Sequence, residues 1–261
     1  MTEPIRLRKD GGMVELLLNR PEAFNAFNLG MIELFAKYLI SLALDDSVSV
    51  LVISGEGKAF CAGGDLKWAI NFSGGPAAAF HELAARYHQA ILEILRMRKP
   101  VVAAVNGIAA GGGFSLALAC DFRVMGQSAI LRQGYTSNGL CIDGGGTFTL
   151  PRVVGLARAL EIVGFDKPIS SAQALAWGLV TKVSEDGRVL EEARKMAREL
   201  AEGSLHSFGW CKQLLMDSFH TPFESHIERE RQGLSSCAAH PDGQEGLKAF
   251  SERRKPKFNV K

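Results

Sequence analysis

The chain of 261 residues lacks the features that mark membrane and exported proteins. It has no uninterrupted apolar run of about 18 residues, the length that a membrane-spanning helix needs. Its beginning also lacks the basic and then apolar pattern of a secretory signal. We therefore expect a soluble, cytoplasmic protein without a membrane partner.

Cysteine is scarce and irregularly placed. The five cysteines are odd in number and include no C-x-x-C pair, which argues against a disulfide framework and against a zinc site. We expect reduced, mostly buried thiols and no bound metal, because the six histidines show no metal-ligand spacing either. Two of these histidines, His81 and His88, belong to a predicted helix and are expected at its surface. The cysteines are Cys61, Cys120, Cys141, Cys211 and Cys237.

An excess of charge of one sign is missing as well. The chain has 30 Lys+Arg and 28 Asp+Glu, a formal net charge of +2, and no dense basic patch that would favour a nucleic acid as partner. The stretch RRKPK at 253–257 is the exception, and it is expected either to meet phosphate groups or to be a solvated end. Hydrophobic residues make up 47%, which is enough for a large core.

Hydrophobic periodicity predicts alternating strands and helices through the first 200 residues. Buried strands are expected at 14–18, 48–54, 101–105 and 122–125. Helices are expected at 31–42, 77–97, 111–118, 147–154 and 190–200. The caps are expected from Asn25 or Asn28 for the first helix and from Ser170 or Ser171 for a further short one. The pattern indicates three successive units of strand, glycine loop and helix.

A glycine-rich turn stands at the centre of this pattern. The stretch AVNGIAAGGGFSLALAC begins at Ala104, where Asn106 and Gly107 turn the chain and Gly111 to Gly113 open an apolar helix. A helix N-terminus behind a glycine loop presents unpaired backbone N–H groups, and glycine lets a ligand approach them closely. The turn therefore favours either a site for a developing negative oxygen or a tight strand-to-helix connection.

The character of the chain changes near Ala201. Residues 1–200 contain the strands and glycine turns, whereas residues 201–261 are nearly all helical, with a break expected at 220–222 and a polar turn at 240–243. So small a helical region cannot easily bury its apolar stripes alone. We expect it to pack on the core or on another subunit.

Taken together, the motifs resemble the crotonase (enoyl-CoA hydratase/isomerase) superfamily over essentially the whole chain. They are LNRPEAFNAFN from Leu18, AFCAGGDL from Ala59, KPVVAAVNGIAAGGG from Lys99, ACDFRV from Ala119, GGGTFTLPRVVG from Gly144, ISSAQALAWGLVTKV from Ile169 and EGLKAFSERRKPKF from Glu245. The resemblance implies an α/β fold, a spiral of ββα units with a C-terminal helical trimerisation region. It also implies a homotrimer or homohexamer that acts on acyl-CoA thioesters without a further cofactor.

The same resemblance implies an oxyanion hole and a CoA site. The backbone N–H groups of Gly64, in CAGGD, and of Gly112, the middle glycine of GGG, are expected to hold the thioester oxygen as an enolate forms. Lys67 and Lys257 are expected near the CoA phosphates, the latter across a subunit boundary. The residues expected at the CoA site are Ala23, Phe24, Ala26, Ala62, Gly64, Asp65, Leu66, Lys67, Gly112 and Lys257.

The chain departs from the hydratase pattern at its two expected glutamates. One position, two residues after the glycine triplet, holds Ser115, and the other, four residues before the next turn, holds Tyr135. We expect both side chains to line the substrate pocket. Asp143 remains as the catalytic carboxylate, partly desolvated by the apolar residues that precede it. Several isomerases and a dehalogenase branch of the superfamily carry an aspartate here, and the alternative role is a cap of the following helix.

Three functions stay open at this point. The leading hypothesis is an isomerase that shifts a double bond through a thioester enolate, with Asp143 as proton shuttle. The second is a hydratase or other lyase or hydrolase on an unusual acyl-CoA, with Asp143 as base or nucleophile. The third is a non-catalytic acyl-CoA-binding homologue.

Overall fold

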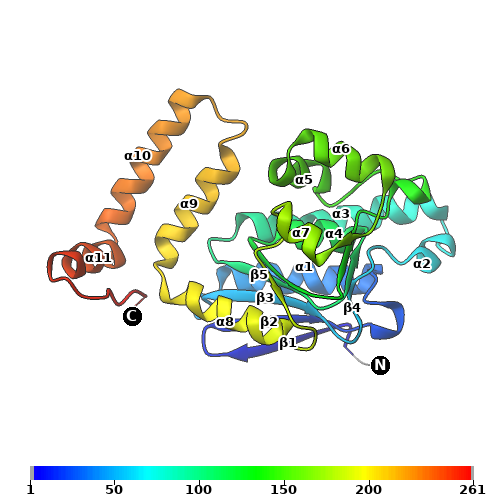
Figure 1. Ribbon diagram of the computed structural model, residues 1–261, viewed down its shortest axis with the longest axis horizontal. Coiled ribbons are helices and arrows are strands. Elements are labelled where there is room, and N and C mark those ends of the chain that lie inside the picture. Colours follow the sequence, from blue (N-terminus) through cyan, green and yellow to red (C-terminus); the bar gives the residue numbers. More distant parts are fainter. Residues whose placement is uncertain (1–2, 260–261) are drawn as a thin grey trace.

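The computed structural model describes residues 3–259, which form two β-sheets covered by helices (Figure 1). The larger sheet has the strand order β1-β2-β3-β5-β7-β10, and the smaller has the order β4-β6-β8-β9. The strands are β1 (Ile5–Asp10), β2 (Met13–Leu18), β3 (Val50–Gly55), β4 (Ala59–Cys61), β5 (Val101–Val105), β6 (Ile108–Ala110), β7 (Phe122–Gly126), β8 (Ile130–Arg132), β9 (Ile169–Ser170) and β10 (Lys182–Ser184).

Eleven α-helices and two 3₁₀ turns accompany these strands in the described part of the chain. The α-helices are α1 (Leu29–Leu44), α2 (Leu66–Ile70), α3 (Gly75–Arg96), α4 (Gly112–Ala119), α5 (Gly146–Val154), α6 (Leu156–Phe165), α7 (Ser171–Ala176), α8 (Val189–Glu202), α9 (Leu205–Asp217), α10 (Phe223–Ala239) and α11 (Pro241–Ser251). The 3₁₀ turns are Pro21–Ala23 and Thr136–Asn138. None of the helices within residues 3–259 combines the length and the apolar character needed to cross a bilayer.

The architecture is built from a repeated step. Strands β3, β5 and β7 pair in parallel in the larger sheet, and the strand that follows each of them, β4, β6 or β8, joins the smaller sheet. A helix then returns the chain after β4 and after β6. The prediction of an α/β fold with successive strand, turn and helix units is confirmed. The short strands β4, β6 and β8 were not predicted, because a strand of three residues is too short to carry a periodic signal.

Both faces of the larger sheet are buried, which explains its continuous apolar strands. Leu51 and Ile53 of β3 face the main core with α1, α3 and α4, whereas Val50 and Val52 face a smaller cluster under α8. Strand β5 lies beside β3 in the sheet, and all five of its residues are buried. The predicted strand at 101–105 therefore has the observed bounds, and the predicted helix at 77–97 differs from α3 by only one or two residues at each end.

The capping signals were predicted correctly at two of three places. The Asn28 side chain accepts a hydrogen bond from Met31 N at 3.0 Å and so begins α1. Ser170 caps α7 in a capping box with Gln173. Asn25 is not a cap: it is fully buried and donates to the carbonyl oxygens of Glu56 and Ala59.

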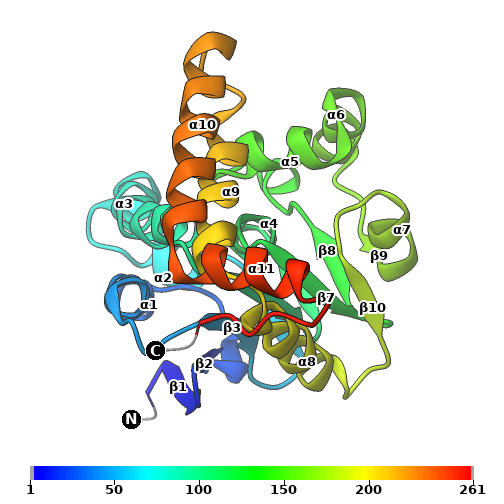
Figure 2. The same cartoon turned by 90° about the vertical axis from the view of Figure 1, so that its left-hand side faces the viewer.

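The C-terminal helices lie to one side of the sheets, with α9 and α10 extending away from them (Figures 1 and 2). A buried ion pair attaches α9 to the core, because Lys212 Nζ lies 2.8 Å from Asp121 Oδ2 and also donates to the Ile94 carbonyl at 2.7 Å. The predicted break at 220–222 separates α9 from α10. The predicted polar turn at 240–243 is wrong, since Pro241 opens α11 and only His240 is the cap.

The division into residues 1–200 and residues 201–261 stays a prediction.

All five cysteines are free, but only Cys61 and Cys120 are buried, while Cys141 and Cys211 are exposed and Cys237 is half-buried. The expectation of mostly buried thiols is therefore wrong. Burial raises the pKa of both the Cys61 and the Cys120 thiol to about 12, so these two are inert core residues.

Candidate functional site

The first glycine turn follows β4 and leaves one amide out of the sheet hydrogen bonds. Phe27 forms an isolated parallel bridge with Gly64. The bridge uses the Phe27 amide, which donates to the Gly63 carbonyl at 2.7 Å, and the Asp65 amide, which donates to the Phe27 carbonyl at 2.8 Å. The Gly64 amide takes no part in this bridge.

The second glycine turn presses against the first. Gly112 is the first residue of α4, so its amide is one of those that a helix cannot satisfy internally. Gly63 has φ +92°, and a Cβ there would lie 2.8 Å from Gly112 N and 2.9 Å from the Ala110 carbonyl oxygen. Only glycine at position 63 therefore allows the two turns to approach so closely.

A small cavity of about 50 Å³ lies where these turns meet. Apart from the two glycines, its wall combines apolar and aromatic side chains with one carboxylate. The lining residues are Phe27, Gly64, Phe80, Leu83, Ala84, Tyr87, Gly112, Tyr135 and Asp143. Gly64, Gly112 and Asp143, which sequence reasoning singled out for chemistry, thus border one space.

Asp143 does not act as a helix cap. The N-cap of α5 is Gly145, and no side chain caps that helix, so the alternative role considered for the aspartate is wrong. Its carboxylate keeps 35% of its surface exposed, and Oδ1 lies 2.5 Å from His88 Nε2 of α3. The carboxylate therefore faces both the cavity and a histidine.

His88 is the residue that sequence reasoning missed. The prediction that His88 lies at the surface is correct, since half of its side chain is accessible to solvent. It did not include the contact with Asp143. The two residues are 55 positions apart in the chain. Their meeting depends on α3 packing beside the turn before α5, and no local pattern signals that.

Ser115 and Tyr135 hold the backbone of the aspartate turn. Ser115 is fully buried, and its hydroxyl donates to the Asp143 carbonyl oxygen at 2.6 Å. Burial raises the pKa of Tyr135 above its ordinary value, although contacts of its hydroxyl with Ser115 and the Asp143 backbone oppose this shift. Tyr135 therefore stays neutral near pH 7. Tyr135 lines the small cavity as expected. Ser115 does not: it is fully buried behind the aspartate turn, so the prediction that its side chain lines the pocket is wrong.

Tyr87 contacts both the start of α4 and the turn that carries Asp143. Its buried hydroxyl donates to the Gly112 carbonyl oxygen at 2.5 Å, and burial raises its pKa well above the ordinary value. Gly144 has φ +62°, and a Cβ there would lie 2.2 Å from Tyr87 Cε1. The ring of Tyr87 therefore sets the distance between the start of α4 and the turn that carries Asp143.

A larger groove of about 870 Å³ adjoins the cavity at Gly64. Eight of the ten residues expected at the CoA site line it, namely Ala23, Phe24, Ala26, Ala62, Gly64, Asp65, Leu66 and Lys67. Arg20 stabilises its wall by an ion pair with Asp65 at 3.0 Å and a hydrogen bond to the Ala26 carbonyl at 2.6 Å. The Asp65 side chain also caps α2 by accepting from Trp68 N.

The remaining two expected CoA residues lie outside this groove. Gly112 borders the adjoining small cavity. Lys257 lies in the C-terminal segment, where its backbone N–H donates to Glu245 Oε1 at 2.8 Å, and Figure 1 places that end of the chain opposite α2. A single chain therefore does not bring Lys257 to the groove, and its contact through a second subunit stays a prediction.

Comparison with known proteins identifies the family. The family model described as enoyl-CoA hydratase/isomerase matches residues 8–261. The chain belongs to this family. Its members act on CoA thioesters, and the chain is therefore an acyl-CoA enzyme of the enoyl-CoA hydratase/isomerase type, as predicted.

Individual relatives include both isomerases and hydratases. The chain is 34% identical to the 1,2-epoxyphenylacetyl-CoA isomerase of Escherichia coli K12, covering 100% of both chains. It is also 34% identical to the crotonyl-CoA hydratase of Syntrophomonas wolfei, covering 98% of each. The crystal structure of an enoyl-CoA hydratase from Polaromonas superposes with a TM-score of 0.92 at 32% identity, covering 98% of this chain and 99% of that one. The predicted crotonase-type fold is thus confirmed.

Proposed function

We propose that this enzyme moves a carbon–carbon double bond within an acyl-CoA thioester, with Asp143 as the proton shuttle. The observation that carries the proposal is the composition of the small cavity. Among the described residues that line it, Asp143 alone has a carboxylate, and it shares the cavity with Gly64 and Gly112. One base beside an oxyanion hole suffices for isomerisation.

The chemistry needs few groups. The amides of Gly64 and Gly112 stabilise the thioester oxygen as negative charge develops, and losing one such donor typically costs about 2.7–4 kcal/mol. Asp143 removes a proton from the α carbon of a 3-enoyl thioester, which gives a dienolate. It then returns the proton at the γ carbon, so that the double bond ends between the α and β carbons.

Hydration is less well supported by this site. Adding water across the double bond in the way of the family's hydratases requires a second carboxylate to hold the water. The two positions expected for glutamates carry Ser115, whose hydroxyl is engaged with the Asp143 carbonyl, and Tyr135, which burial keeps neutral. Neither side chain accepts a proton readily near pH 7.

The His88 contact favours a second candidate, a hydrolase. In this reaction an Asp143 oxygen attacks an acyl-group carbon that bears a leaving group, and the group departs with its bonding electrons. His88 then takes a proton from water, which cleaves the resulting ester and restores the carboxylate. The 2.5 Å separation between His88 Nε2 and Asp143 Oδ1 puts a base beside that ester.

Isotopic labelling separates the two candidates. With a 3-enoyl-CoA in deuterium oxide, we expect the 2-enoyl isomer with deuterium at the γ carbon, as measured by mass spectrometry and NMR. Repeating the reaction in oxygen-18 water should leave the product unlabelled in oxygen. Because a 3-enoyl-CoA carries no leaving group, the hydrolase is tested separately with a halogenated acyl-CoA in oxygen-18 water. Release of halide with solvent oxygen in that product, and no isomerisation of the 3-enoyl-CoA, would contradict the isomerase proposal and support the hydrolase.

We expect His88 to act as a positioning residue for the carboxylate. His88→Ala should lower kcat about tenfold with little change in KM, because the side chain orients the Asp143 base and not the CoA group. His88→Gln, which retains a donor, should recover part of the loss. His81→Gln on the same helix is the control. Equal losses in His88→Ala and His88→Gln would contradict the positioning role.

We also propose a homotrimer or homohexamer in the cytoplasm, with CoA carried by the substrate and no separate cofactor. The C-terminal region supports the assembly because large apolar side chains in α9 to α11 and in the turn between α9 and α10 are exposed to solvent in a single chain. These are Leu215, Phe219, Phe223, Leu234 and Phe250, which are 63–86% exposed. Helices α9 and α10, which carry most of them, pack against each other, and a contiguous apolar surface on such a pair is typical of a protein interface.

A further inference from the structure

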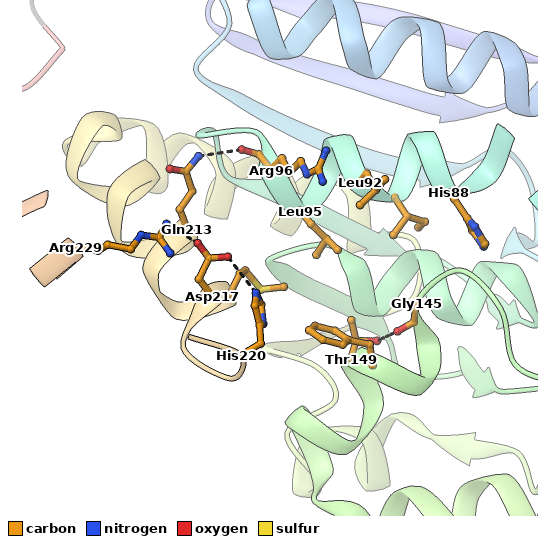
Figure 3. Close-up of a pocket in the computed structure, with 13 residues that line it drawn as sticks. His88, Leu92, Leu95, Arg96, Gly145, Thr149, Gln213, Asp217, His220 and Arg229 are labelled. Atoms are coloured by element: carbon orange, nitrogen blue, oxygen red, sulfur yellow. Dashed lines mark hydrogen bonds and ion pairs between the residues drawn. The ribbon is translucent and has the colours of Figure 1, made fainter. Parts of the chain in front are cut away.

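The Asp143–His88 pair borders the small cavity on its Asp143 side and a much larger cavity on its His88 side. This cavity holds about 770 Å³ and lies between α3, α5 and α9 (Figure 3). His88 and Gly145 line it, while Asp143 lines the small cavity. The pair therefore forms the partition between the reacting atoms and an open space of the size that ligand pockets have, about 300–1,000 Å³.

The small cavity cannot contain an acyl chain by itself. Its 50 Å³ is far below the roughly 300–1,000 Å³ that ligand pockets have. Any acyl group longer than the reacting carbons has to continue elsewhere. The groove at Gly64 matches the residues expected at the CoA site, so the cavity beyond His88 is the remaining adjacent space.

The larger cavity runs along α3 and changes character on the way. Figure 3 shows Leu92, Leu95 and Arg96 following His88 along this helix, with Thr149 of α5 across from them. From His88 to Arg96 the helix advances by eight residues, or about 12 Å. Along α3, His88 is thus followed by the apolar Leu92 and Leu95 and then by Arg96, whose side chain points back toward Leu92 (Figure 3).

Two of the basic side chains that line this cavity near α9 lie beside a carboxylate, whereas Arg96 does not. Arg229 pairs with Asp217 at 2.6 Å, and His220 lies 3.5 Å from the same carboxylate. Arg96 is exposed and forms no ion pair with any residue in 3–259, since only its backbone carbonyl is engaged, by Gln213. Arg96 is therefore the cation available to an anionic ligand in this cavity.

We propose that the cavity between α3, α5 and α9 receives the acyl group, and that Arg96 selects medium-length acyl groups that end in a carboxylate. This inference rests on the proposed function, because the acyl carbons must start at Asp143. The apolar part of the acyl chain would lie along Leu92 and Leu95, and its terminal carboxylate would accept hydrogen bonds from the Arg96 guanidinium group.

The test compares two 3-enoyl-CoA thioesters of equal medium length, one ending in methyl and one in carboxylate. We expect the intact enzyme to prefer the carboxylate in kcat/KM. Arg96→Gln should lower the ratio of the two kcat/KM values about tenfold, mainly through KM, as expected for loss of one charge-assisted hydrogen bond. Arg86→Gln, on the same helix but paired with Glu33 outside the cavity, should leave the ratio unchanged.

A second variant tests whether the acyl group enters the cavity. Leu95→Trp should lower kcat/KM more for medium-length thioesters than for the shortest 3-enoyl thioester. If the intact enzyme isomerises neither thioester, the proposed function fails. If it turns over both but Arg96→Gln leaves their ratio unchanged, the proposed specificity fails. A changed native mass of Leu95→Trp by light scattering would show that a second copy of the chain covers the cavity, and would overturn the proposal.

Discussion

Asp143→Asn is expected to lower kcat for double-bond isomerisation about 10²–10⁴-fold, the usual contribution of a positioned general base. Asparagine has nearly the same shape and can still hydrogen-bond to His88, but it cannot carry a proton between two carbons. Steady-state kinetics with a 3-enoyl-CoA measure the effect. KM is expected to change little, because the CoA groove lies on the other side of Gly64.

Two controls make this result interpretable. Glu33→Gln removes an exposed carboxylate from α1, far along the chain from the aspartate turn, and should retain full activity. Binding of a CoA thioester to Asp143→Asn, measured by calorimetry, should match the unaltered enzyme and so exclude a folding defect. Wild-type turnover by Asp143→Asn would remove the carboxylate from the mechanism.

Gly63→Ala is expected to lower kcat about 10²–10³-fold, the range seen when one oxyanion donor is lost. The added Cβ would lie 2.8 Å from Gly112 N, so the two turns would have to separate. The left-handed φ of +92° would strain the alanine as well. Both effects move the Gly64 and Gly112 amides without changing any side chain that reacts.

Gly178→Ala is the matched control for backbone strain. Gly178 also has a positive φ, +74°, but a Cβ there would meet no atom within 4 Å. It should lower stability slightly, as seen in a urea unfolding curve, and leave kcat unchanged. If Gly63→Ala were as active as Gly178→Ala, the approach of the two glycine turns would have no part in catalysis.

The parts of the fold predicted correctly are those with a strong local signal. Strand β5 has a continuous run of apolar residues that are buried on both faces, and α1 begins at the Asn28 cap. The small strands β4, β6 and β8 and the edge strand β1 were missed, since their hydrogen bonds come from neighbours distant in the chain. The helical start of α11 was missed because Pro241 was interpreted as part of a turn.

The amino-acid sequence alone indicates which reacting groups the chain has. It contains glycines at positions 64 and 112, serine and tyrosine at the two expected glutamate positions, and one aspartate at position 143, and its motifs identify the family. Residue types and short-range spacing suffice for these conclusions, because they concern what a side chain or turn can do chemically.

Which of these groups meet depends on how the helices and turns pack in three dimensions. Tyr87 packs against Gly144 and donates to the Gly112 carbonyl oxygen, and so sets the separation between the start of α4 and the turn that carries Asp143. The next residue on α3, His88, thereby reaches Asp143. The large cavity beyond this pair likewise exists because α9, attached by the buried Lys212–Asp121 pair, stands beside α3. Such contacts join residues tens of positions apart, and the packing of whole elements, which no local pattern encodes, creates them.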